Sequence, residues 1–147
     1  MKRFIFIIMF CFNIVMLNAA QTWKEFAQEF TQTTNENSVL LESYFRSLGI
    51  NIKIYSSYTS DPNELVMDLR TGTEKLWKEL TKKDSMVVIK STMLQQYRQY
   101  YRTDEEFRKS IETMKSSNGQ FRIIISYLKN NSLKTKDISI TPDEIMR

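Results

Sequence analysis

The feature that most constrains this chain is the near absence of residues that could form disulfide bonds or bind a structural metal ion. It has one cysteine, Cys11, and no histidine among its 147 residues. Cys11 lies in an N-terminal apolar segment that we expect to be removed, which would leave no disulfide, thiolate or imidazole. We therefore expect no metal site and no cofactor, and a fold held together by the packing of an apolar core.

The N-terminus has the pattern of a secretory signal peptide. Lys2 and Arg3 form a short basic start, Phe4 to Leu17 is apolar except for Asn13, and Ala19 offers a small residue for cleavage. The pattern predicts a signal peptide over 1–19, a secreted, extracellular protein, and one helical domain over 20–147. No later segment approaches the roughly 18 apolar residues of a membrane span, so we expect no transmembrane segment.

Helical periodicity favours an all-α fold. Only three glycines and two prolines interrupt the sequence. Apolar residues recur at helical spacing over 23–30 and again over 39–48, where Gly49 suits a left-handed C-terminal position. We predict two helices that are separated at 33–35 and form a helical hairpin. The whole chain is predicted to be an all-α, single-domain bundle of five to six amphipathic helices with short connections.

The central region gives the same helical interpretation. Ile50 to Tyr55 alternates apolar and polar residues, which fits a short strand or an extended crossing segment, and we favour the crossing segment. Pro62 suits the first turn of a helix that contains Leu65, Val66 and Leu69. Asp84 could cap a long central helix.

The C-terminal region completes the expected bundle. Thr103 and Glu106 fit a capping box that starts a further helix. The segment 121–128 is apolar around most of its circumference, which favours a buried helix, although the β-branched run 123–125 also permits a strand. Residues 141–144 predict one short terminal helix.

Charged residues give no catalytic or nucleic-acid motif. The carboxylate pairs fall on predicted solvent-facing arcs or first helical turns, so we expect a protein that is not an enzyme. The run 95–102 mixes tyrosine with arginine, but on a helix the rings and the cations occupy different sides. Removing Lys2 and Arg3 from 21 basic residues leaves 19 against 17 acidic ones, so we expect no nucleic-acid partner.

Two further features concern the surface and the core. Asn130-Asn131-Ser132 is a glycosylation sequon, which makes Asn130 the candidate acceptor.

Several methionines fall on predicted apolar faces, where flexible side chains suit either ordinary core filling or an adaptable apolar binding surface.

Two segments resemble a known family. Phe26 through Ile52, with Leu41-x-x-Tyr44-Phe45 leading into Gly49-Ile50-Asn51-Ile52, is similar to a helix of the insect allergen repeat family, secreted midgut proteins related to cockroach gut allergens. Tyr101-x-x-Asp104-x-Glu106-Phe107 resembles a second helix of that family. The segments cover about half of the expected mature chain. The resemblance implies an all-helical shell around an apolar cavity that holds lipid, with no catalytic residues to transfer.

The leading functional hypothesis is a secreted, non-enzymatic protein that binds a fatty acid or other lipid in an internal cavity. The residues predicted to line that cavity are Phe30, Phe45, Leu69, Trp77, Met86, Met93, Phe107, Met114 and Ile124. The alternative is a secreted protein-interaction module, an effector or gut-surface component, that uses an exposed helix face. The sequence does not identify the protein partner of such a module.

Overall fold

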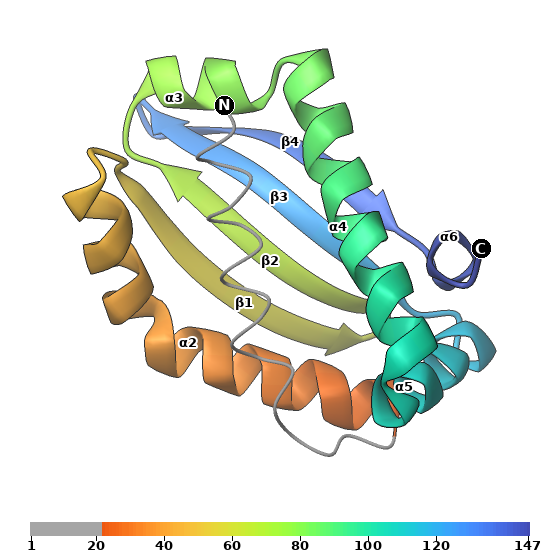
Figure 1. The fold of residues 1–147 in the computed structure, drawn as a ribbon. Coiled ribbons are helices and arrows are strands. Elements are labelled where there is room, and N and C mark those ends of the chain that lie inside the picture. The colour runs from red at the N-terminus through yellow and green to blue at the C-terminus, as the bar shows by residue number, and fades with distance from the viewer. Residues whose placement is uncertain (1–21) are drawn as a thin grey trace.

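The computed structural model describes residues 22–147, which form a mixed α and β fold (Figure 1). The predicted signal peptide and its cleavage site lie outside the described residues. In chain order the elements are α2 (Trp23–Ser47), β1 (Ile52–Ser60), β2 (Asn63–Thr71), α3 (Glu74–Leu80), α4 (Lys83–Thr103), α5 (Glu105–Ser116), β3 (Gln120–Lys129), β4 (Ser132–Ile140) and α6 (Pro142–Ile145).

The four strands form one sheet in the order β1-β2-β3-β4. The pairs β1–β2 and β3–β4 are antiparallel hairpins, whereas β2 and β3 are parallel. A parallel pair needs a long crossover, which α3, α4 and α5 supply here. The helices α2 and α4 lie over the same face of this sheet, which we call the inner face (Figure 1).

The all-α prediction is therefore wrong, and the first hairpin shows why. The segment interpreted as an extended crossing is β1, with Ile52 and Ile54 buried on the inner face. The segment interpreted as a helix after Pro62 is β2, whose buried residues Leu65, Met67 and Leu69 recur every second position. A strand needs a partner to satisfy its backbone, and β2 supplies to β1 the partner that the sequence pattern did not reveal.

The second hairpin corrects the C-terminal predictions. The apolar segment 121–128 belongs to β3, so the strand that its β-branched residues permit is the observed structure. The polar segment after Asn131 is β4. Asn130 and Asn131 connect the two strands with φ values of 49° and 60°. Two consecutive positive φ angles are typical of the type I′ turn, whose twist matches that of the flanking strands.

The helix α2 is continuous, so the predicted interruption at 33–35 is also wrong. It begins with a capping box between Thr22 and Glu25. Thr34 is buried and Asn35 bonds to β1, so contacts with the sheet favour helix where local propensity is weak. Gly49 follows the helix with φ +75°, as the sequence predicted.

The helices that the sequence predicted at α4, α5 and α6 are present, although α4 and α5 begin at different residues from those predicted. Asp84 lies inside α4, which begins at Lys83. The cap of α5 is Asp104, whose side chain accepts a hydrogen bond from the Phe107 N–H at 2.9 Å, in place of the expected Thr103. Thr141 and Glu144 form the capping box of the short helix α6.

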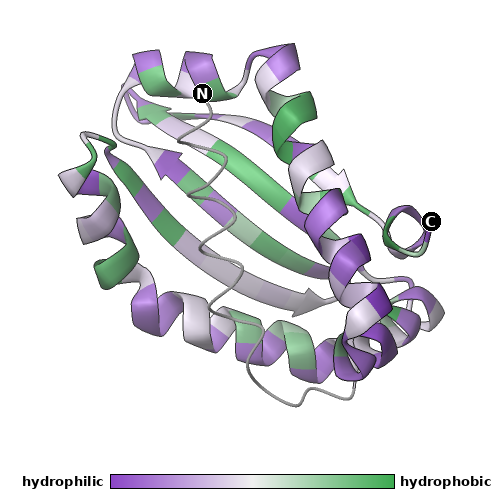
Figure 2. Cartoon of the chain, in the orientation of Figure 1, coloured by the Kyte–Doolittle hydropathy of each residue, from purple (hydrophilic) through white to green (hydrophobic). Residues whose placement is uncertain are grey.

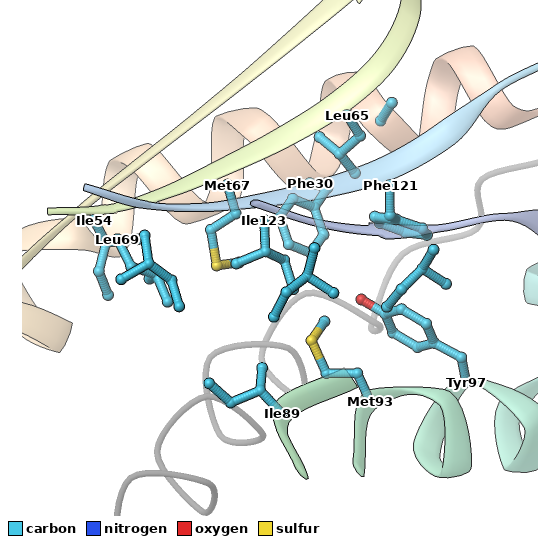
Figure 3. Packing of buried hydrophobic residues seen from close by; sticks show 14 of the residues in the cluster. Phe30, Ile54, Leu65, Met67, Leu69, Ile89, Met93, Tyr97, Phe121 and Ile123 are labelled. Carbon is cyan, nitrogen blue, oxygen red and sulfur yellow. The ribbon is translucent and has the colours of Figure 1, made fainter. Parts of the chain in front are cut away.

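The core is one apolar cluster between the helices and the inner face (Figure 3). From α4, Met93 and Tyr97 point towards strand residues such as Ile123. An aromatic group closes the end of the sheet beside α5. Its members are Trp23, Phe26, Phe30, Tyr97, Phe107 and Phe121.

The opposite face of the sheet, the outer face, is mainly polar. Hydrophobic and hydrophilic residues therefore alternate along the strands (Figure 2). Arg122 lies 3.5 Å from Glu64 and 3.3 Å from Asp137, on the strands to either side. An antiparallel hairpin can leave one face in water when polar side chains line it. In residues 22–147, no helix is long and apolar enough to cross a bilayer.

Candidate functional site

Eight of the nine residues predicted to line a cavity lie on the helix side of the sheet. Phe30, Phe45, Leu69, Met93, Phe107 and Met114 belong to the buried cluster, and Trp77 and Met86 pack against it while partly exposed. Ile124 is the exception. It pairs with Asp68 and Asp137 on the outer face, because neighbouring strand residues point to opposite sides.

A different set of apolar side chains is exposed, on the C-terminal half of α2 and at its C-cap, Leu48. Leu40, Tyr44 and Leu48 follow one another at intervals of four residues, with 70, 49 and 46% of their surface exposed. Residues four apart share one side of a helix, so these three form a continuous stripe. We call it the α2 stripe. Val39, also 70% exposed, lies further round the helix.

The side of α2 that carries the stripe follows from its other contacts. Asn35 and Glu42 bond the backbone of β1, which places that edge strand beside one flank of the helix. Leu41 and Phe45 are buried against the sheet. At about 100° per residue, Leu40 and Tyr44 fall beyond the buried residues, on the flank opposite Asn35. The α2 stripe thus borders the apolar core on the side turned away from the β1 edge.

The loop that follows the stripe leads towards a basic end of the molecule. The Gly72 N–H donates to the Asn51 carbonyl at 2.8 Å, so the loop after α2 lies beside the start of α3. There Glu74 contacts three ammonium groups. They belong to Lys129 at 2.8 Å, and to Lys78 and Lys134 at 3.4 Å each.

Positive charge exceeds negative charge in this cluster of Glu74 and three lysines. The hydrogen bond from Lys129, followed by that from Lys78, lowers the pKa of Glu74 from 4.5 to about 2. The same contact raises the pKa of Lys129. One carboxylate shared by three lysines leaves two positive charges uncompensated, and Lys134 also lies 5.6 Å from the centre of the Trp77 ring.

A polar cleft of about 710 Å³ lies at the opposite end of the sheet, between the β1–β2 turn, the α5–β3 turn and α6. Its polar groups bond mainly to one another. Lys115 Nζ lies 2.8 Å from Asp143 Oδ1, and that hydrogen bond raises the lysine pKa and lowers the aspartate pKa. Asn63 Nδ2 donates to the Ser117 carbonyl at 3.0 Å, while its Oδ1 accepts from Trp23 Nε1 at 3.0 Å.

Those cleft contacts hold three connections of the fold together. They assemble no metal-binding cluster, since no group of three or more acidic residues within 22–147 is placed to hold an ion. The cleft is therefore a structural junction in our interpretation, and the α2 stripe with the adjoining basic end is the stronger candidate for binding.

The glycosylation sequon is at an accessible position. Asn130 occupies the exposed β3–β4 turn. Its glycosylation stays a prediction.

The sequence located Leu40 and Tyr44 on one apolar helical face together with Phe45, but it did not separate the exposed residues of that face from the buried ones. The signal that could have separated them is the width of the face, since Val39, Leu40, Leu41, Tyr44 and Phe45 span more of the circumference than one buried side needs. The basic end was missed because its lysines come from two segments about 50 residues apart. Comparisons of the chain with protein-family models, curated proteins and solved structures found no match.

Proposed function

We propose that this protein is a non-enzymatic, exported carrier that binds a long-chain fatty acid along the α2 stripe. The observation that carries the proposal is the exposure of Leu40, Tyr44 and Leu48 as one apolar stripe beside the core. In this arrangement the acyl chain lies along the stripe, and the fatty-acid carboxylate points towards the basic end that the loop after Leu48 approaches.

The apolar contact sets the expected affinity. Leu40 and Leu48 are separated by eight residues, which corresponds to about 12 Å of helix. Covering about eight methylenes at ~0.8 kcal/mol each gives roughly 6 kcal/mol before the entropic cost of binding. Without that cost, the value would correspond to a dissociation constant of tens of micromolar, and the entropic cost makes binding weaker still, so we expect weak, reversible binding.

Charge complementarity selects an acid over other apolar molecules. Lys78, Lys129 and Lys134 share the single carboxylate of Glu74, so a second carboxylate is favourable there. A fatty acid should therefore bind more tightly than the alcohol of the same chain length, and added salt should reduce the difference.

The test is titration of the purified protein with a fluorescent fatty acid. We expect saturable binding that Leu40→Gln and Tyr44→Gln each weaken about threefold to tenfold, since each removes part of the apolar contact. Val87→Gln is the matched control, because Val87 is a comparably exposed apolar residue on α4. Circular dichroism establishes that all three variants remain folded.

Two results would contradict the proposal. One is the absence of saturable binding by the folded protein, and the other is binding that the α2 variants and Val87→Gln reduce equally. The absence of binding would favour the second candidate, an exported protein-interaction module, since the same exposed helix face could contact apolar side chains of a protein.

A further inference from the structure

The basic end of the molecule is formed by two segments that are distant in the sequence. Residues 74–84, which contain α3 and the start of α4, and residues 128–136 at the β3–β4 turn lie at the same end of the sheet (Figure 1). The contacts of Lys129 and Lys134 with Glu74 join them directly. Together they carry seven lysines: Lys75, Lys78, Lys82, Lys83, Lys129, Lys134 and Lys136.

These lysines give the end a strong positive charge. The two segments contain three carboxylates, those of Glu74, Glu79 and Asp84, so their net charge is +4. That value equals the formal net charge of the whole chain. All seven lysines are exposed except Lys134, which is half-buried. Residues 22–147 carry 19 basic and 17 acidic side chains, a net charge of +2, so the described residues outside these two segments have a net charge of −2.

Exposed leucines accompany these charges. Leu128 and Leu133 are opposite one another in the β3–β4 register, and 54 and 50% of their surfaces are exposed. A partner that binds through charge alone would gain no binding free energy from these two leucines. The register places Leu128 and Leu133 on the outer face of the hairpin, and Lys129, Lys134 and Lys136 on its inner face. When the β3–β4 turn meets a membrane end-on, the leucines and the lysines reach it together, which suits the boundary between the headgroups and the acyl chains of an anionic bilayer.

We infer that the protein docks peripherally on anionic phospholipid bilayers through its basic end, with Leu128 and Leu133 inserted at the interface. This inference uses residues outside the α2 stripe, and it stands whether or not a fatty acid binds there. Asn130 lies on the same turn, between the two leucines. A glycan on Asn130 would hold the turn away from the bilayer, so glycosylation and docking exclude one another.

The test is flotation of the purified protein with vesicles of phosphatidylcholine alone and of phosphatidylcholine with 30% phosphatidylglycerol, chosen as a moderately anionic composition. We expect binding to the anionic vesicles only, and weaker binding as salt is raised. Lys75→Gln and Lys136→Gln should each weaken it about fivefold. Lys24→Gln is the matched control, since Lys24 is exposed at the start of α2, away from the basic end.

Substitution of the two leucines distinguishes binding to a bilayer from binding to other anionic partners. The double variant Leu128→Ser/Leu133→Ser should bind the anionic vesicles about tenfold more weakly, while its binding to soluble heparin stays unchanged. Equal binding to both vesicle types, equal effects of Lys24→Gln and Lys136→Gln, or binding to heparin without binding to vesicles would each overturn the inference. Circular dichroism of each variant verifies that the fold is intact.

Discussion

Asn35 of α2 pairs with Ser56 of β1 as a neighbouring strand would. The Asn35 side-chain amide donates to the Ser56 carbonyl at 2.9 Å, and its carbonyl oxygen accepts from the Ser56 N–H at 2.9 Å. Glu42 adds a bond from the Ile54 N–H at 3.2 Å. An unpaired edge strand is a template for aggregation, and here two side chains of a helix occupy that edge.

Replacing Asn35 should expose the edge of β1. We expect Asn35→Ala to lower the free energy of unfolding by about 1–2 kcal/mol, because two hydrogen bonds with the backbone are lost, and to increase self-association. Urea unfolding and sedimentation velocity measure the two effects. Glu36→Ala, an exposed change on the next residue, is the control, and equal behaviour of the two variants would disprove this role.

The Glu74 cluster should make stability depend on pH in the acid range. The folded-state pKa of about 2 lies below the ordinary 4.5, so the charged carboxylate stabilises the fold above about pH 4.5. That stabilisation is lost as the pH falls from 4.5 towards 2. Glu74→Gln should therefore be less stable than the parent at pH 7 and equally stable near pH 2. Urea midpoints across this range measure the difference, and a constant difference would refute the assignment.

Thr34 should tolerate the loss of its hydroxyl. It is buried on α2, and its Oγ1 has no hydrogen-bond partner within residues 22–147. Since an unpaired buried hydroxyl is unfavourable, we expect Thr34→Val to raise the free energy of unfolding by about 1 kcal/mol. Thr33→Val, at a partly exposed neighbouring position, should have a smaller effect. Thermal unfolding compares them, and a destabilised Thr34→Val would contradict the prediction.

Gly119 should resist any side chain, because a Cβ there would lie 2.6 Å from Trp23 Nε1. Trp23 is fixed by its bond to Asn63 and by an edge contact with the Phe121 ring 4.9 Å away. Gly119→Ala should therefore cost about 1–3 kcal/mol and shift the tryptophan fluorescence. Gly49→Ala, at φ +75°, should destabilise without that spectral shift. An unshifted spectrum for Gly119→Ala would show that the indole can move.

The helices could be predicted because their signals are local. In α5, the capping residues and the spacing of Phe107, Ile111 and Met114 all fall within 12 residues. The strands could not be predicted in this way, since Leu65, Val66 and Leu69 fit a helix as well as Leu65, Met67 and Leu69 fit a strand. The arrangement is decided by β3, whose Phe121 pairs with Leu65 across more than 50 residues.

The candidate site was less predictable than the fold for a related reason. The sequence identifies Leu40, Leu41 and Phe45 as apolar but does not reveal which of them the sheet covers. That depends on Asn35 and Glu42 fixing the rotation of α2 against β1. Likewise, Lys78 and Lys134 become neighbours only when the β3–β4 turn folds against α3.

The most direct measurement of the carrier proposal is calorimetric titration of the purified protein with a fatty acid and with the alcohol of equal chain length. The proposal predicts one site per chain, a lower dissociation constant for the acid, and loss of that site in the variant Leu40→Gln/Tyr44→Gln. Heat unaffected by the double substitution, or the absence of a saturable site in the folded protein, would contradict it.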